Sequence, residues 1–413
     1  MIALAAALLV TSCGASVGPV ARGISPSPSA SPVAARTPSP PPPTSPAPDA
    51  AASPAPTPPM PTPPMPIVSC VQGTVPTFQA VVQGSSWLLY DVGDPLHPRL
   101  ACRIANTPVH LIAGTSFEYV VPNRDGTTTV MRHSLGSNSE TVAATVQADL
   151  YHVYTGWYGG VAWMPGGGRL AYLAGGGTDA QGLGVTDVWL ATPTGRTRIY
   201  SYSVPGKDAF GRPGFAPITL DFSRDGAYLA AGWYVATTRP RVFRLTDHAD
   251  VSPQLPTDFR FAFWSKTQDT LYMVGGSGVE TWSPGGPVTP LQGTAAWTLG
   301  PSLAPDGKQV VFTIVTPTRD VRTYVYDFAS ASSRLLSDQP RSSALFVKSG
   351  WVWQVEEKPC VQSSTTSCFD PTVPDGRVLA VDLSTGREEA VTFAPGESAT
   401  DYGMLPGDLW PKT

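Results

Sequence analysis

The sequence predicts an all-β protein, a β-propeller of seven blades or alternatively six, preceded by a disordered proline-rich linker. After residue 67, short apolar runs alternate with clusters of Gly, Pro, Asp and Ser, without helical periodicity. A strand–turn–strand unit recurs roughly every 40 residues between Phe222 and Leu345, which suits a four-stranded blade. The inner strands read as continuous apolar runs, as expected where neighbouring blades cover both faces. A β-sandwich is the competing fold, but it does not predict this recurrence.

The first twelve residues form a short apolar run that stops before Cys13. An apolar residue, two small residues and a cysteine, Val10-Thr11-Ser12-Cys13, resemble the lipobox of bacterial lipoproteins. The resemblance implies a lipid on Cys13 and removal of residues 1–12 as a signal peptide. The alternative is an ordinary signal peptide with an incidental cysteine. No Lys or Arg precedes the run, so whether Met1 is the true start stays open.

Residues 13–67 form the predicted lipidated N-terminus and linker. From Pro26 to Pro66 the chain is dominated by Pro, Ser, Ala and Thr, and Arg36 and Asp49 are its only charges. Such a segment has little to bury and few backbone donors, so we expect extended polyproline II. At about 3.1 Å per residue its reach is on the order of 130 Å. A spacer is the preferred interpretation, and a proline-rich ligand for a binding groove is the alternative.

The propeller is expected over residues 68–400, followed by a C-terminal tail at 401–413. In its strand–turn–strand unit, four apolar residues each precede a second apolar residue by seven: Trp163 and Leu170, Phe222 and Leu229, Trp264 and Leu271, Leu303 and Val310. Three of the four turns carry Asp-Gly or Gly-Gly, at Gly166-Gly167, Asp225-Gly226 and Asp306-Gly307, and these pairs tolerate the positive φ of tight hairpins. Because the turn recurs in several repeats, Arg224-Asp225 is interpreted as a bend and not as a site.

A second unit is a strand that ends at a polar turn. It gives seven hairpin positions, near residues 91, 133, 191, 245, 282, 327 and 382. Asp91, Asp327 and Asp382 each end such a strand, where a carboxylate can accept N–H bonds from the following turn. We therefore expect these three carboxylates to be structural.

The repeats resemble those of the TolB-type, WD40-like β-propeller family, whose core reads aromatic-Ser-Pro-Asp-Gly followed by an apolar strand. The best copies are Ala304-Pro305-Asp306-Gly307-Lys308, before Val310, and Phe222-Ser223-Arg224-Asp225-Gly226, before Leu229. The match is fair over residues 160–315 and weaker elsewhere, and no Trp-Asp dipeptide occurs. The resemblance implies a propeller and a tendency to bind partners, but no particular partner.

Four cysteines follow Cys13, an even number that suggests disulfides outside the cytoplasm. Sequence order favours Cys70–Cys102 and Cys360–Cys368. The alternative pairs Cys70 or Cys102 with the last blade as a clasp that closes the ring. No metal site is expected, because neither Cys-x-x-Cys nor His-rich spacing occurs.

No catalytic motif appears. Gly-x-Ser-x-Gly, His-Glu-x-x-His and the phosphate-binding loop are all absent from the sequence, and no cofactor is predicted. The five histidines are scattered and are interpreted as surface or packing residues: His97, His110, His133, His152 and His248. We therefore predict no catalytic residue and no enzyme.

The candidate binding residues are aromatic. Trp157-Tyr158 and Trp233-Tyr234 each follow a glycine, and at a blade end such rings could stack on sugars or anchor a protein loop. The competing interpretation, which we favour, is that Trp157 and Trp233 pack between blades.

Charged residues make up only 14 % of the chain, and the net charge is −4. No block rich in Lys and Arg occurs, so nucleic acid is not an expected partner. The expected protein is a monomeric lipoprotein on the extracytoplasmic face of a bacterial membrane. Its propeller is expected to bind a protein or glycan without catalysis, and a propeller glycosidase or lyase acting on cell-surface polysaccharide is the alternative.

Overall fold

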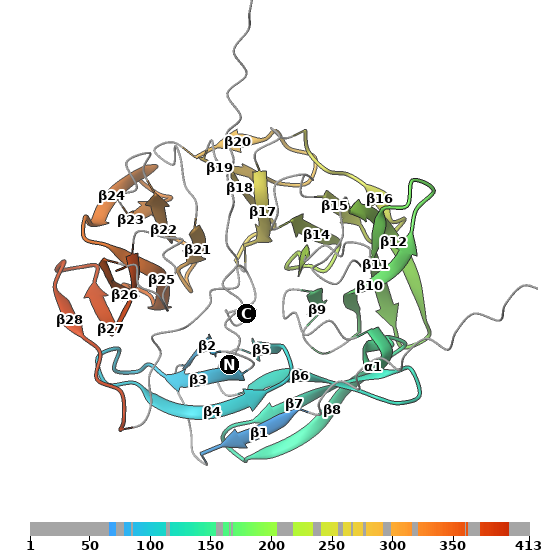
Figure 1. Ribbon diagram of the computed structural model, residues 1–413, viewed down its shortest axis with the longest axis horizontal. Coiled ribbons are helices and arrows are strands. Elements are labelled where there is room, and N and C mark those ends of the chain that lie inside the picture. The colour runs from blue at the N-terminus through green and yellow to red at the C-terminus, as the bar shows by residue number, and fades with distance from the viewer. Residues whose placement is uncertain are drawn as a thin grey trace, which may run out of the picture. The chain divides into compact units, whose positions relative to one another are not determined.

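The structure is a computed structural model of the 413-residue chain (Figure 1). It describes residues 66–71, 78–83, 86–112, 116–153, 160–164, 166, 168–204, 218–233, 241–254, 259–265, 267–275, 278–291, 299–315, 321–359, 361 and 372–395. The chain divides into two units, Met1–Met60 and Pro61–Thr413, and every described residue belongs to the second unit. The predicted signal peptide, Cys13 and the predicted linker up to residue 65 lie outside the described residues, and Ile67, the last residue of the predicted linker, begins the first strand.

Seven antiparallel four-stranded sheets form the blades of a β-propeller, which confirms the predicted fold and blade number. Figure 1 shows the sheets arranged as a ring, each with one strand toward the centre and one at the rim. From the centre outward, blade 1 contains β2 (Phe78–Gln83), β3 (Ser86–Asp91), β4 (Arg99–Ala105) and β1 (Ile67–Cys70). Blade 2 contains β5 (Val109–Ile112), β6 (Ser116–Pro122), β7 (Thr128–Ser134) and β8 (Ser139–Val146).

The other five blades follow in chain order. Blade 3 contains β9 (Val161–Trp163), β10 (Leu170–Thr178), β11 (Gly184–Thr192) and β12 (Gly195–Val204), after the short helix α1 (Leu150–Val153). Blade 4 contains β13 (Ile218–Phe222), β14 (Tyr228–Trp233), β15 (Arg241–Arg244) and β16 (Ala249–Asp250). Blade 5 contains β17 (Phe259–Trp264), β18 (Leu271–Gly275), β19 (Gly278–Trp282) and β20 (Thr289–Pro290). Blade 6 contains β21 (Leu299–Leu303), β22 (Gln309–Val315), β23 (Val321–Asp327) and β24 (Ser332–Ser337). Blade 7 contains β25 (Arg341–Lys348), β26 (Trp351–Pro359), β27 (Thr372–Asp382) and β28 (Glu388–Ala390).

The first two strands of a blade join at the turn that the repeat predicts. The four apolar pairs seven residues apart are directly opposed across these hairpins: Trp163 and Leu170, Phe222 and Leu229, Trp264 and Leu271, Leu303 and Val310. The turn glycines adopt left-handed backbone, with φ of 67° at Gly226 and 70° at Gly307. Asp225 accepts a hydrogen bond from the N–H of Ala227 at 2.9 Å, so its predicted role as a bend is confirmed.

The predicted polar turns also lie where the sequence places them. The strands β3, β7, β11, β15, β19, β23 and β27 end at or within one residue of the seven expected hairpin positions. Asp91 accepts from the N–H of Gly93 at 3.0 Å, Asp327 from Ser330 at 3.0 Å and Asp382 from Ser384 at 2.8 Å. These contacts confirm the structural role of the three carboxylates.

Blade 1 differs from the other six because its first strand in sequence, β1, is its outermost strand. Blades 1 and 7 meet through loop and side-chain contacts. The indole N–H of Trp353 donates to the carbonyl of Pro95 at 2.9 Å, and the N–H of Thr392 donates to the carbonyl of Leu96 at 2.8 Å. Phe393 packs edge-on against Trp353, with ring centroids 5.7 Å apart. The last blade is thus packed against the first, and β1 is left at the rim.

Candidate functional site

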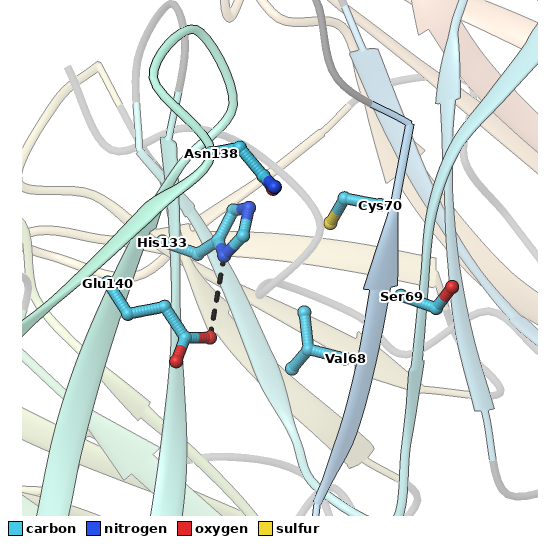
Figure 2. A pocket seen from close by; sticks show the side chains of 6 residues that line it. All are labelled: Val68, Ser69, Cys70, His133, Asn138 and Glu140. Carbon is cyan, nitrogen blue, oxygen red and sulfur yellow. Dashed lines mark hydrogen bonds and ion pairs between the residues drawn. The ribbon is translucent and has the colours of Figure 1, made fainter.

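A groove lies at the rim of the propeller, between the edge strand β1 of blade 1 and the β7–β8 hairpin of blade 2 (Figure 2). Its volume is about 570 Å³, and six residues line it: Val68, Ser69, Cys70, His133, Asn138 and Glu140. Three of these residues are consecutive on β1, and the other three belong to the hairpin. We define these six residues as the rim groove.

The hairpin wall follows from its turn and register. Four residues, 135–138, connect β7 to β8, and Asn138 adopts left-handed backbone with φ of 48°. Asparagine tolerates this conformation better than most residues do. The register places His133 directly opposite Glu140, so both side chains lie on the same face of the sheet. Sequence and turn geometry together therefore direct an imidazole and a carboxylate toward the groove.

Glu140 provides the carboxylate of the rim groove. Its Oε1 accepts a hydrogen bond from the phenol of Tyr119 at 2.7 Å and lies 3.4 Å from Nδ1 of His133. Burial and the hydrogen bond to Glu140 raise the pKa of the Tyr119 phenol, so Tyr119 is a neutral donor at ordinary pH. The side chain of Glu140 is 42 % exposed, so the carboxylate remains open to a ligand.

His133 is a packing residue, as the sequence suggested, and one of its ring nitrogens has no hydrogen-bond partner among the described residues. Its ring stacks on Phe117, with centroids 5.0 Å apart and an interplanar angle of 20°. The other ring nitrogen, Nε2, is buried and has no hydrogen-bond partner among the described residues. A buried nitrogen of this kind is unusual in folded proteins.

The opposite wall is held by a disulfide. Cys70 on β1 lies directly across from Cys102 on β4, and the two are bonded, which confirms the predicted pairing and overturns the alternative clasp to the last blade. In Figure 2 the side chains of Val68 and Cys70 point toward the hairpin, whereas the Ser69 hydroxyl points away from it. Ser69 and His133 therefore do not form a nucleophile–base pair.

Exposed apolar side chains are concentrated around the two strands that form the rim groove. Within the part of the chain that the structure describes, five large apolar residues are exposed, and three of them lie on or directly next to the two strands beside the groove. They are Ile67, 62 % exposed at the start of β1, Val71, 68 % exposed directly after β1 ends, and Val142, 61 % exposed on β8. By alternation, Ile67 and Val71 share the face of β1 that carries Ser69, opposite the groove. Clusters of exposed apolar side chains on a soluble domain typically mark a binding surface.

The aromatic residues that the sequence predicts as a binding site lie almost wholly outside the described residues, so this site stays a prediction. Trp157, Tyr158 and Tyr234 lie outside the described residues, and only the backbone of Trp233, the last residue of β14, is described. Cys360 and Cys368 also lie outside the described part, so their pairing stays a prediction.

Sequence reasoning missed the rim groove. Its hairpin was recognised, but the opposition of His133 and Glu140 follows only once the turn length fixes the register. No local signal placed β1 beside blade 2. Among the described residues, no cluster of three or more His, Cys, Asp or Glu side chains could hold a metal ion. Nor is any helix within the described ranges long and apolar enough to cross a membrane.

No protein-family model and no curated protein matches the chain. Among solved structures, it is similar to a prolyl endopeptidase with 14 % identity and a TM-score of 0.43, covering 79 % of this chain and 49 % of that one. It is similar to TolB from Acinetobacter baumannii with 12 % identity and a TM-score of 0.36, covering 78 % of each chain. It is also similar to oligogalacturonate lyase in complex with manganese, with 10 % identity and a TM-score of 0.39, covering 78 % of this chain and 86 % of that one. The chain thus spans about half the length of the prolyl endopeptidase.

Similarities at this level of identity and TM-score carry no argument about activity. The fold assignment depends on the seven four-stranded sheets of the chain itself.

Proposed function

We propose that this chain is a lipoprotein on the extracytoplasmic face of a bacterial membrane, and that its propeller is a non-catalytic, monomeric binding scaffold. The expected partner is a protein or a glycan at the cell surface. The observation that carries the proposal is the rim groove, an open cavity with an exposed carboxylate and exposed apolar side chains on both flanking strands. The Cys13 motif and the proline-rich stretch support the membrane anchor and the spacer.

The use of carboxylates in the propeller also favours binding over catalysis. Asp91, Asp327 and Asp382 accept backbone N–H bonds in turns of three different blades. Glu118, on β6, is fully buried and accepts hydrogen bonds from Arg132, Trp163 and Gly166. Glu140 is the only carboxylate lining the rim groove. A glycosidase or lyase, the alternative function, needs several convergent acidic or basic groups.

Photo-crosslinking in cells tests the binding role. The full chain would carry a photo-crosslinking amino acid at Val142, beside the groove, or at Leu335, which is 47 % exposed on β24 of blade 6. We expect a discrete adduct from Val142 and none from Leu335. Equal labelling at both positions, or none at either, contradicts a binding role for the groove. Depolymerisation of cell-surface polysaccharide by the purified chain would support the enzyme instead.

Membrane fractionation tests the anchor separately. A Cys13→Ser variant of the full chain lacks the sulfur to which the lipid would be attached. We expect the unmodified chain in the membrane fraction, labelled by a clickable fatty acid, and the variant unlabelled. Equal labelling of both chains contradicts lipidation at Cys13.

A further inference from the structure

β1 is an edge strand that has one neighbour within the described residues. It pairs with β4 over four residue pairs, from Ile67 opposite Ala105 to Cys70 opposite Cys102, and it ends the strand order of its sheet. The disulfide between Cys70 and Cys102 fastens it to the blade. An exposed edge with unpaired backbone groups is a template for another strand.

The register identifies which backbone groups of β1 face outward. The N–H of Val71 donates to the carbonyl of Ala101 at 2.8 Å, so Val71 directs its polar backbone groups toward β4. In an antiparallel pair this direction alternates along the strand, so Ser69 and Ile67 also face β4. Val68 and Cys70 therefore direct their N–H and C=O groups to the open edge of the sheet. Their side chains point out of the sheet, toward the hairpin, and line the rim groove on that face of β1.

The side chains around this edge define the chemistry of an occupant. Ile67 and Val71 offer apolar surface on the face of β1 that carries Ser69, and Val142 offers apolar surface on β8, next to the groove. The hairpin wall carries the half-exposed carboxylate of Glu140, and none of the six described residues that line the cavity is a Lys or an Arg. A positively charged side chain complements this wall, because Glu140 Oε2 accepts no hydrogen bond from the residues that the structure describes.

The chain's own linker is poorly suited to this edge. Residues 56–66, which immediately precede β1, read PTPPMPTPPMP, and more than half of them are prolines. Proline has no backbone N–H, so this segment offers few of the donors that a strand pairing with β1 needs.

We propose that β1 accepts an extended segment of a partner protein as an added β-strand, with a Lys or Arg side chain of that segment directed at Glu140. The backbone groups of Val68 and Cys70 form the main-chain hydrogen bonds, and apolar side chains of the segment cover Ile67, Val71 and Val142. The inference rests on the proposed binding function, and it specifies a polypeptide strand as the class of partner.

Fluorescence anisotropy with labelled peptides and the full chain in detergent tests the inference. The first probe is a nine-residue peptide of alternating Thr and Val with a central Arg. A second probe has a central Glu, and a third has the Arg sequence with alternate backbone amides N-methylated. We expect the Arg peptide to bind at least tenfold more tightly than the Glu peptide and the N-methylated peptide not to bind. Equal affinity of all three overturns strand addition.

Two variants of the chain sharpen this test. Val68→Pro removes an outward N–H, and an edge strand tolerates Pro at such a position, so we expect lost peptide binding in a folded protein. Glu140→Gln should weaken the Arg peptide about tenfold and leave the Glu peptide unchanged or tighter. Glu389→Gln is the matched control, because Glu389 lies on β28, the outer strand of blade 7, and its removal should change nothing. Circular dichroism and thermal unfolding check that each variant folds.

The outcomes separate this inference from the proposed function. Adducts at Val142 without peptide binding would leave the scaffold standing and overturn strand addition. If the chain gave neither a Val142 adduct nor peptide binding, both the binding scaffold and strand addition would be overturned. A dimer in analytical ultracentrifugation that Val68→Pro dissociates would assign the edge to a second copy of this chain and overturn the partner strand.

Discussion

Two boundaries between neighbouring blades bury polar side chains, and they satisfy them differently. Between blades 2 and 3, the carboxylate of Glu118 accepts hydrogen bonds from Arg132 at 2.6 Å, the indole of Trp163 at 3.1 Å and the N–H of Gly166 at 3.1 Å. Between blades 6 and 7, Gln354 and Thr323 are also fully buried, but the amide and the hydroxyl have no hydrogen-bond partner in the described part. The stability of the first boundary therefore depends on the carboxylate of Glu118, whereas the second boundary is formed even though its polar side chains have no hydrogen bond from a described residue.

Alternation along the strands places Gln354 and Thr323 at the same boundary. Trp353 packs toward blade 1, beside Tyr90, so Gln354 on the opposite face of β26 is directed at blade 6. Val325 belongs to the same apolar cluster as the core of blade 7, so Thr323, two residues earlier on β23, is directed at blade 7. The side chains of both residues thus lie at the interface between blades 6 and 7.

Removal of the Glu118 carboxylate should have the largest effect. In Glu118→Ala, the buried indole N–H of Trp163 and the N–H of Gly166 lose their acceptor, and Arg132 loses its counter-charge. We expect a loss of about 3–5 kcal/mol in the free energy of unfolding, measured by urea denaturation. Glu389→Ala, on an outer strand, should cost under about 0.5 kcal/mol. A loss below about 1 kcal/mol for Glu118→Ala would remove the contrast between the two boundaries.

The second prediction compares one position of the repeat in two blades. Asp221 precedes Phe222 on β13 and accepts the buried N–H of Trp264 in blade 5 at 2.7 Å. Ser302 precedes Leu303 on β21 and accepts the N–H of Phe346 in blade 7 at 3.0 Å. A hydrogen bond to a charged acceptor contributes more to stability than one to a neutral hydroxyl. Asp221→Ala should therefore lower the free energy of unfolding by about 2–3 kcal/mol, and Ser302→Ala by about 1 kcal/mol. The reverse order in urea denaturation would contradict the argument from acceptor charge.

The fold could be predicted because its signals are local. Trp264 and Leu271 are seven residues apart and pair across one turn, and Asp327 bonds to the turn that follows it. The Cys70–Cys102 disulfide could be predicted from the sequence because both cysteines belong to one blade. The rim groove could not be predicted, because β1 and the hairpin at Asn138 belong to neighbouring sheets. Their approach depends on the arrangement of blades 1 and 2, for which residues 67–70 carry no periodic signal.

The roles of Glu118 and Gln354 were equally inaccessible to sequence reasoning. Both are polar residues within otherwise apolar strands, FEYVV and WVWQV. The donors of Glu118 include Trp163 and Gly166, which are 45 and 48 residues away in the chain. Only the packing of one blade on the next distinguishes a saturated carboxylate from an unpaired amide.

An apolar boundary gives the third prediction, a dependence on pH. Tyr272 packs between blades 5 and 6, its ring stacked on Phe263 with centroids 5.3 Å apart. Burial raises the pKa of its phenol to about 12. An unfolded tyrosine ionises near pH 10, so the folded state holds the proton longer and its stability falls as the pH rises from about 10 to about 12.

Tyr272→Phe isolates this contribution. One raised phenol can remove up to about 1.4 kcal/mol per pH unit in that window, so at pH 11 the unmodified chain should lose about 1 kcal/mol more than the variant does. Urea denaturation at pH 8 and pH 11 measures the difference. The pH 8 measurement is the internal control, because below the unfolded pKa the phenol is neutral in both states. An equal loss for both chains would exclude Tyr272 as a source of alkaline sensitivity.

The smallest expected effect tests the boundary between blades 6 and 7 directly. Gln354→Leu replaces an amide that pairs with no described residue by an apolar side chain of similar size, in a cluster that already holds Val352 and Val381. Replacing an unpaired polar group in this way is neutral or stabilising, so we expect a change within about 0.5 kcal/mol of zero, or a gain of up to about 1 kcal/mol. Gln309→Leu is the matched control, because the amide of Gln309 donates to Asp327 at 3.1 Å, and its removal should cost about 0.5–1.5 kcal/mol. If Gln354→Leu lowers the free energy of unfolding more than Gln309→Leu does, the buried amide of Gln354 makes a stabilising polar interaction at this boundary. The two boundaries would then differ less in how they satisfy buried polar groups.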